Sequence, residues 1–234
     1  RIDSGGVSVA ARFDSVETLT GGAQADTFLF TNSGSLHGPI DGGGGIDKLI
    51  GDNDGNQFRV HTKDTGTLAG KANTLGLSMD TGGELVDFAN IETLQGGSGV
   101  DTFLIEAILV GDVIGQSGND LFRFTVTGTI LGSVQGGVGT DTLIGDDDGN
   151  IFDIIGTVNG STPIAAIGRG QIATKTSLFT AIENLVGGAG NDEFNFATLG
   201  SITGTVDGAS GVNGITGDSD GNIFTVTSPN FGML

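Results

Sequence analysis

The chain has 234 residues, of which 45 are glycine and none is cysteine, tryptophan or tyrosine. The absence of cysteine excludes a disulfide framework and a thiolate metal site. A formal net charge of -19 at pH 7, from 28 acidic and 9 basic residues, argues against nucleic acid or an anionic membrane surface as a partner.

Glycine at this frequency disfavours helices, because each glycine in a helix interior costs about 1 kcal/mol relative to alanine. No apolar run approaches the roughly 20 residues of a membrane helix, so direct membrane insertion is not expected, and no signal peptide opens the chain. Hydrophobic residues still make up 36% of the chain, which is too many for a disordered linker. The composition therefore predicts an all-β protein with many short strands and turns.

Three similar blocks follow one another along the chain. Their approximate boundaries are residues 1–78, 79–168 and 169–234. Each block contains a Phe-x-x-Ile/Val-Glu element that leads through Gly-Gly into a turn and a strand; these elements begin at Phe13, Phe88 and Phe179. Each block closes on two tandem nine-residue units, at 42–59, 136–153 and 208–225. Because equivalent segments recur throughout, we expect residues 1–234 to form one continuous segment, excised from a longer repeat protein.

The strands of these units show a period of two. The eighth residue of a unit is often phenylalanine, the residue two positions later is apolar, and the residue between them is often polar. The phenylalanines are Phe28, Phe58, Phe103, Phe122, Phe152, Phe194 and Phe224. Such alternation is typical of a half-buried strand. We expect these rings to stack in columns inside the core.

The sixth residue of the units sets the period of the fold. Asp101, Asp120 and Asp141 follow one another at steps of 19 and 21 positions, and the step within a tandem pair is nine. This pattern predicts one coil of about 20 residues with two similar turns on opposite edges. Since parallel crossovers are nearly always right-handed, the expected fold is a right-handed parallel β-helix, or β-solenoid, about 55 Å long. Residues 61–86 and 155–178 repeat poorly and are expected to form degenerate coils or loops that leave the stack.

Stacking of the coils would place acidic side chains above one another. The sixth-position aspartates are Asp26, Asp47, Asp101, Asp120, Asp141 and Asp192. Two carboxylates ~5 Å apart repel by about 1 kcal/mol in water. Ca²⁺ would relieve this repulsion, because it accepts six to eight carboxylate and carbonyl oxygens in flexible geometry. The alternative is that these side chains form turns and cap backbone amides without a metal.

Units such as GGVGTDTLI at 136–144 and GGAGNDEFN at 187–195 resemble the Gly-Gly-x-Gly-x-Asp-x-apolar-x nonapeptide of the RTX (repeats-in-toxin, haemolysin-type) calcium-binding family. The resemblance implies a parallel β-roll in which the six aspartates above and the turn carbonyls hold Ca²⁺ between successive turns. The wider Ile/Val-Glu-Asn/Thr-Leu-x-Gly-Gly pattern is similar to repeats of large filamentous-haemagglutinin-like bacterial surface adhesins. Each coil of the RTX roll is two nonapeptides long, whereas the longer steps here favour a wider, three-faced coil.

The second unit of each tandem pair carries the sequence Gly-Asp-x-Asp-Gly-Asn. Its acids, such as Asp146 and Asp148, are further candidates for calcium ligands. An EF-hand is rejected, because the twelfth position is Lys63, Thr157 or Pro229 instead of glutamate and a strand follows in place of a helix. The remaining interpretations are a calcium-binding turn and a solvated acidic turn.

No catalytic motif is present in the sequence. It contains no nucleophile elbow, phosphate loop, zinc-protease helix or dinucleotide fingerprint, and the only histidines, His37 and His61, are expected at the surface. We therefore expect a non-enzymatic stalk or adhesive segment of a large secreted or cell-surface bacterial protein, stiffened by Ca²⁺, that self-associates or binds a host or matrix surface. The alternatives are a calcium-triggered folding and secretion module of an RTX-type exoprotein and a polysaccharide-acting β-helix enzyme.

Overall fold

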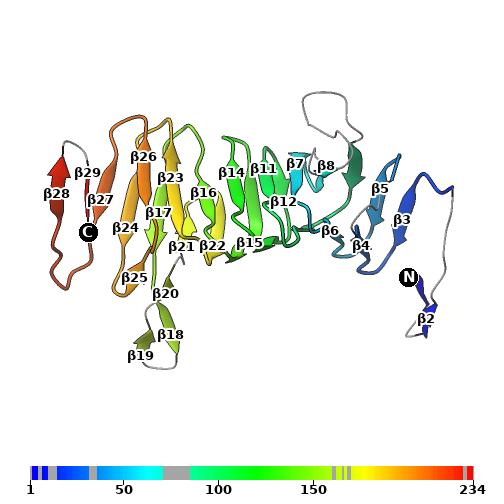
Figure 1. Ribbon diagram of the computed structural model, residues 1–234, viewed down its shortest axis with the longest axis horizontal. Helices are drawn as coiled ribbons and strands as arrows, with labels where there is room; N and C mark the ends of the chain where they lie inside the picture. The colour runs from blue at the N-terminus through cyan, green and yellow to red at the C-terminus, as the bar shows by residue number, and fades with distance from the viewer. Residues whose placement is uncertain are drawn as a thin grey trace.

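The computed structural model describes residues 2–4, 7–9, 15–31, 36–70, 85–159, 162–164, 166–167, 170–228 and 231–233. All regular structure in these ranges is β-strand, so the prediction of an all-β protein is confirmed. The strands lie side by side along the long axis of an extended body, with two main sheets (Figure 1).

Sheet I has ten strands. In spatial order they are β26 (Val206–Ala209), β23 (Asn184–Gly188), β16 (Thr142–Ile144), β14 (Leu121–Phe124), β11 (Thr102–Ile105), β7 (Asn56–Thr62), β8 (Thr65–Gly70), β9 (Val86–Ala89), β5 (Ile40–Gly43) and β3 (Leu19–Gly22).

Sheet II has eleven strands. In spatial order they are β27 (Gly214–Thr216), β24 (Glu193–Phe196), β17 (Ile151–Ile154), β21 (Gly170–Ile172), β22 (Thr176–Thr180), β15 (Thr129–Val138), β13 (Val113–Ser117), β10 (Thr93–Gln95), β6 (Lys48–Ile50) and β4 (Thr27–Leu29), with β12 (Ile108–Leu109) also paired to β15.

Four further pairs of short strands lie outside the two main sheets. They are β1 (Ile2–Ser4) with β2 (Val7–Val9), β18 (Thr157–Asn159) with β19 (Thr162–Ile164), β20 (Ala166–Ile167) with β25 (Gly200–Ser201), and β28 (Thr225–Ser228) with β29 (Phe231–Met233). Of these four pairs, β20–β25 is parallel and the others are antiparallel.

Most neighbours in the main sheets are parallel and keep equivalent residues in register. Phe103 of β11 pairs with Phe58 of β7 on one side and with Phe122 of β14 on the other. These partners lie 45 and 19 positions away in the chain, as do the hydrogen-bonded residues of the turns that precede the strands. The short steps predicted from the aspartates therefore recur as strand register, and longer steps, such as 42 and 45 positions, appear where the chain makes an excursion between partners.

The excursions are antiparallel insertions, so the two main sheets are mixed and not parallel throughout. β8 pairs antiparallel with both β7 and β9, and β21 pairs antiparallel with both β17 and β22. They fall within the two stretches that repeat poorly in sequence. The β18–β19 hairpin, in the second stretch, projects from the body (Figure 1). Residues 71–84 of the first stretch lie outside the described residues.

Two sheets also replace the three faces expected from the longer period. The core between them contains phenylalanine columns, as the strand pattern predicted, but the prediction was wrong for two of the seven rings: Phe28 is only half-buried and Phe224 is 51% exposed. Phe58, Phe103 and Phe122 form one parallel stack, with centroids 4.9 and 5.0 Å apart, and Phe152 and Phe194 form a second at 4.7 Å. All five rings are at most 1% exposed. The rings therefore form two short columns instead of one continuous spine.

The Phe-x-x-Ile/Val-Glu element has a fixed backbone conformation at its third residue. Ser15, Asn90 and Ala181 have φ values of 56°, 53° and 51°. This left-handed conformation costs a residue with a Cβ roughly 1–2 kcal/mol, and asparagine tolerates it better than alanine. It reverses the chain just before Ile91 and Ile182, which are fully buried.

Candidate functional site: the acidic turns

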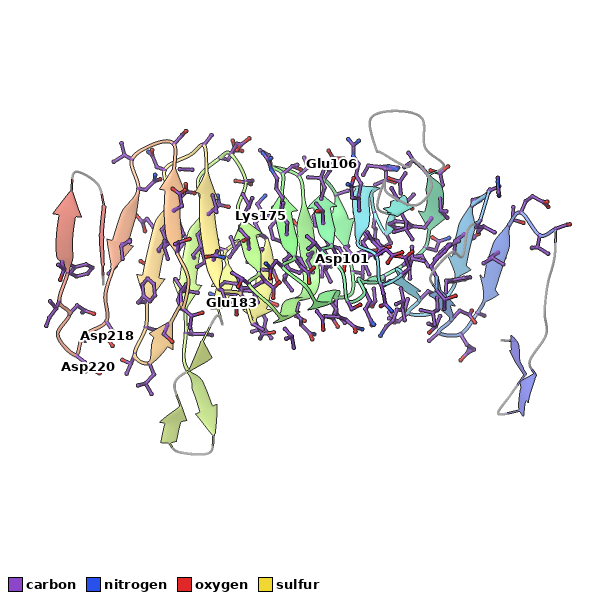
Figure 2. The ribbon with its side chains drawn as sticks, in the orientation of Figure 1. Asp101, Glu106, Lys175, Glu183, Asp218 and Asp220 are labelled. Carbon is purple, nitrogen blue, oxygen red and sulfur yellow. The ribbon has the colours of Figure 1, made fainter. Side chains whose placement is uncertain are left out.

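The sixth-position aspartates point into the body instead of towards solvent. Asp47, Asp101, Asp120, Asp141 and Asp192 are at most 1% exposed, and Asp26 is half-buried. Figure 2 shows Asp101 within the stack of strands, whereas Asp218 and Asp220 lie near one end of the body. Buried carboxyl groups are rare unless they are paired, so their partners decide what these turns do.

One oxygen of each buried aspartate accepts a hydrogen bond from the backbone of a neighbouring turn. The amide of Asp101 donates to Asp120 Oδ1, and the amide of Asp120 donates to Asp141 Oδ1, each at 2.8 Å. The same contact joins Asp26 to Asp47 Oδ1 at 2.7 Å and Asn150 to Asp192 Oδ1 at 2.8 Å. The side chains therefore form a ladder that connects successive turns, which is the amide-capping role weighed above as the alternative to a metal.

The second oxygen occupies space left by a glycine five residues earlier. A Cβ on Gly115 would lie 2.2 Å from Asp120 Oδ2 and 2.5 Å from the carbonyl oxygen of Gly136. A Cβ on Gly136 would lie 2.5 Å from Asp141 Oδ2 and 1.9 Å from the carbonyl oxygen of Ala181. The first glycine of the repeat is thus required because the carboxyl group and a neighbouring carbonyl fill its side-chain position.

Asparagine at the sixth position uses the same space differently. Asn150 Nδ2 donates to the carbonyl oxygens of Asp146 at 3.0 Å and Gly187 at 3.2 Å, and to Asp192 Oδ1 at 3.0 Å. Asn213 Nδ2 likewise donates to the carbonyl oxygen of Gly208 at 2.8 Å. Amide and carboxyl side chains therefore occupy equivalent sites, but only the amide carries hydrogen atoms at every pH.

Two glutamates complete the ladder, and sequence reasoning assigned them no role. Glu92 Oε2 accepts the amide of Asp47, and Glu183 Oε2 accepts the amide of Asp141, each at 2.8 Å. Both belong to the Phe-x-x-Ile/Val-Glu element. The recurrence of glutamate in that element was the signal that could have identified them.

The surroundings of the ladder change the acidity of its carboxyl groups. Burial raises the pKa of Asp120 to about 7, and the carboxylates of Asp101 and Asp141 raise it as well. Burial raises the pKa of Asp141 to about 6, with a further contribution from Glu183. Burial also raises the pKa of Asp101, although hydrogen bonds from Gly97 and Asn56 oppose the change.

The acids of the second tandem unit have separate environments. Asp146 is 4% exposed, accepts the amide of Asp148 at 3.0 Å and forms an ion pair of 2.5 Å with Lys175. Lys175, itself 6% exposed, also donates to the carbonyl oxygens of Thr125 and Val126. Asp148 is exposed. The sequence offered no sign of the Lys175 pair, because this lysine lies in a stretch that repeats poorly.

These contacts bear on whether the acids fit calcium. Among the described residues, no group of three or more histidine, aspartate or glutamate side chains is placed to hold a metal ion. Oδ1 of each buried aspartate accepts a hydrogen bond from a backbone amide, and Oδ2 fills the space left by the missing side chain of a glycine. Asp146 forms an ion pair with Lys175. The described residues therefore show no cluster of carboxylates that would supply several of the six to eight oxygens of a calcium site. Calcium binding by the protein in solution stays a prediction.

No catalytic constellation is evident in the described part of the chain. His37 and His61 are at exposed positions. A pocket of about 540 Å³ beside β26 and β27 is lined by residues of which Asp207 alone is titratable. No helix long and apolar enough to cross a membrane occurs in the described residues.

Comparisons with known proteins assign no family to the chain. No protein-family model matches it, and no curated protein sequence is significantly similar to it. The geometry above is therefore the evidence on which a function must rest.

Proposed function

We propose that the chain is a β-solenoid segment with a mechanical role: a stiff, acidic stalk or adhesive part of a large secreted or cell-surface bacterial protein. In this proposal the chain winds right-handed through sheet I and sheet II in coils of about 20 residues, and antiparallel hairpins enlarge some coils. Its partners are a second copy or a host or matrix surface, and it carries out no catalysis.

The observation that carries the proposal is the repetition of the same contacts from turn to turn. Where no excursion intervenes, parallel strands pair in register at spacings of 19 or 21 positions, and in β4–β6, β11–β14 and β14–β16 the pairing is accompanied by an aspartate–amide bond. Stability is then a sum of similar nearest-neighbour terms, as in other repeat proteins. A polypeptide built in this way distributes load along its length, whereas an enzyme or receptor concentrates distinctive groups at one place.

Single-molecule force spectroscopy tests the mechanical role. Because each coil contacts only its neighbours, pulling the chain by its ends should release coils one after another. Each released coil of about 20 residues lengthens the chain by at most about 70 Å. A single release of the whole folded length would contradict the proposal, because it would indicate one cooperative globular core.

Circular dichroism in excess EDTA separates the stalk from a calcium-triggered folding module. The stalk proposal predicts the same strand signal at 37 °C with and without the chelator. Loss of that signal in EDTA, restored by added Ca²⁺, would favour the folding module instead.

A further inference from the structure

The two ends of the stack of strands present contacts that are satisfied inside it. Figure 1 shows β27 and β28 at one end of the body and β3 at the other. β27, β3 and β4 are each the last strand of a main sheet, so each has one edge without a strand partner in the described chain. An open edge of this kind presents unpaired amides and carbonyls that can bind another strand.

β28 has only one of the two partners that its equivalents have. It belongs to the third Gly-Asp-x-Asp-Gly-Asn unit, as β7 and β17 belong to the first two. Both β7 and β17 have an antiparallel partner on one edge, β8 or β21, and a parallel partner on the other, β11 or β24. β28 has the antiparallel partner, β29, and no parallel one within the described ranges. The missing partner is a strand that follows a Gly-Gly-x-x-x-Asp turn.

The turn before β28 already has the geometry of the two equivalent turns inside the stack. The φ values of Gly55, Gly149 and Gly221 are 95°, 95° and 92°. A Cβ on Gly55 would lie 2.6 Å from the carbonyl oxygen of Val100 in the neighbouring turn. A Cβ on Gly149 would lie 2.7 Å from that of Asn191, whereas a Cβ on Gly221 would meet no described atom within 4 Å. The place of the neighbouring carbonyl is therefore open at this end.

The turn at the opposite end has a matching gap beside Gly22. The equivalent glycines inside the stack approach the carbonyl oxygens of Asp52 and Asp146, since a Cβ on Gly97 or Gly188 would lie 1.9 Å from them. A Cβ on Gly22 would meet only the aspartate side chain of its own turn, at 3.8 Å, among the described atoms. This end therefore lacks the carbonyl of a preceding turn.

The hydrogen bonds between turns are incomplete at both ends. Inside the stack, the asparagine of the second tandem unit donates its amide to Oδ1 of the next aspartate, at 2.6 Å from Asn56 and 2.8 Å from Asn150. The equivalent donor, the amide of Asn222, has no acceptor among the described residues. The equivalent acceptor, Asp26 Oδ1, receives no amide from them.

The glutamate contact repeats this pattern. Glu92 and Glu183 each accept the amide of a sixth-position aspartate. The equivalent pair is the amide of Asn213 and the exposed side chain of Glu17, and this bond is not made within the part of the chain that the structure describes. Donors are thus unused at one end of the stack and acceptors at the other, so the two ends are complementary.

We propose that the end formed by β27 and β28 binds the end formed by β3 and β4 of a second copy, so that copies add head to tail. In this join Asn222 and Asn213 donate their amides to Asp26 and Glu17 of the second copy, and β27 and β28 pair in parallel with its β3 and β4. The carbonyl oxygen of Asp218 lies beside its Gly22. The join rests on the stalk function proposed above, whose second-copy partner it specifies.

The alternation of the sheets and the apolar core both continue across the join. The strands β4, β11 and β24, which follow the Gly-Gly turns of the three blocks, lie in sheet II, sheet I and sheet II. A second copy turned by half a revolution about the long axis continues this order. Phe224, which is 51% exposed, then stacks on the half-buried Phe28 of the second copy, as Phe58 stacks on Phe103 at 4.9 Å.

One residue weakens the join relative to the contacts inside the stack. The fourth residue of the docking turn is Gly99 or Gly190 inside the stack, and a Cβ there would lie 2.4 or 2.1 Å from the amide nitrogen of Gly55 or Gly149. The turn at the exposed end carries Gln24 instead. Gln24→Gly removes this overlap and should raise the association constant of the copies by about tenfold.

Cysteine cross-linking tests the orientation of the join. Inside the stack Ile144 pairs with Val186, and the equivalent pair across the join is Thr216 with Thr20 of the second copy. Both threonines are exposed, and the protein has no cysteine. Thr20→Cys and Thr216→Cys, purified separately and mixed under mild oxidation, should form a disulfide-linked dimer, because paired strands lie about 4.8 Å apart. Neither variant alone should do so, since its cysteines all lie at the same end of the copies.

Two substitutions at the exposed end should weaken association, as measured by sedimentation velocity. Gly22→Ala adds a methyl group that meets a neighbouring turn only in the join, and Glu17→Ala removes an acceptor used only there. Each should lower the association constant by about tenfold or more and leave the urea midpoint of the monomer unchanged. Gly44→Ala is the matched control, because its Cβ would meet only Ala23 Cα, at 3.8 Å, and should keep the wild-type association.

Three results would overturn the head-to-tail join. The first is a monomer for both the wild type and Gln24→Gly at concentrations up to about 1 mM. The second is a single-cysteine variant that dimerises alone as readily as in the mixture, which would indicate contact between like ends. The third is wild-type association of both Gly22→Ala and Glu17→Ala. Stepwise unfolding of the monomer under force would stand after any of these results, so failure of the join is distinguishable from failure of the stalk function.

Discussion

Replacement of Phe103 by alanine tests the phenylalanine column. This ring is fully buried and stacks on Phe58 at 4.9 Å and on Phe122 at 5.0 Å. Removal of a buried phenylalanine costs about 3–5 kcal/mol, and the two lost stacks place Phe103 at the upper end of this range. With a urea m-value of about 3 kcal/mol/M, the unfolding midpoint should fall by more than roughly 1 M.

Phe224 provides the matched control, because it occupies the same position of the repeat but is 51% exposed. Phe224→Ala should change the free energy of unfolding by roughly 0.5 kcal/mol or less, as is usual at exposed sites. Phe103→Leu keeps most of the apolar volume and should cost about 1–1.5 kcal/mol. Equal losses for Phe103→Ala and Phe224→Ala in urea denaturation would refute the reasoning, since sequence position would then matter and burial would not.

Three further substitutions test the turns and the buried ion pair. Gly115→Ala should destabilise the protein by about 1–3 kcal/mol in urea titrations, because its Cβ would meet Asp120 Oδ2 and a carbonyl oxygen. Gly214→Ala should be nearly neutral, because its Cβ would meet no atom within 4 Å. A larger loss for Gly214→Ala than for Gly115→Ala would contradict the claim that the aspartate fills the space beside the glycine. Lys175→Met should cost about 3–5 kcal/mol of stability in the same assay, because it leaves Asp146 buried without its partner. The double variant Lys175→Met/Asp146→Asn should recover most of the lost stability. No recovery in the double variant would show that the ion pair is not the cause. Ala181→Gly should raise the thermal unfolding temperature by relieving about 1 kcal/mol of left-handed backbone strain, and a lower temperature would exclude that strain.

The strand pattern and the period were legible in the sequence because both arise from local chemistry. Alternation around Phe103 and Phe122 predicted buried positions, and the step of 19 positions from Asp101 to Asp120 reappears as strand register. The antiparallel excursion through β8 was not predictable, since it occupies a stretch without the repeat pattern and its pairing depends on distant strands.

The direction of the aspartate side chains was the main point that sequence left open. A Gly-Gly turn permits an aspartate to point outward to a cation or inward to an amide, and the same nonapeptide is compatible with both. The inward choice for Asp120 depends on a tertiary fact, the close approach of the Gly136 carbonyl to Gly115. Lys175 escaped notice for a similar reason, because burial beside Asp146 leaves no local signature.

The stacked arrangement is tested most directly by a distance along sheet I. Paired residues run from Arg59 through Leu104, Arg123, Ile144 and Val186 to Asp207, one strand at a time. Five steps of about 4.8 Å place Arg59 and Asp207 roughly 24 Å apart, although the two residues are distant in the chain.

Both residues are exposed, and the protein has no cysteine of its own, so Arg59→Cys/Asp207→Cys can be labelled at these two sites alone. Double electron–electron resonance between the two spin labels should give a single narrow distribution within about 10 Å of that distance. A broad distribution, or one centred beyond roughly 40 Å, would contradict the stacking of parallel strands in register.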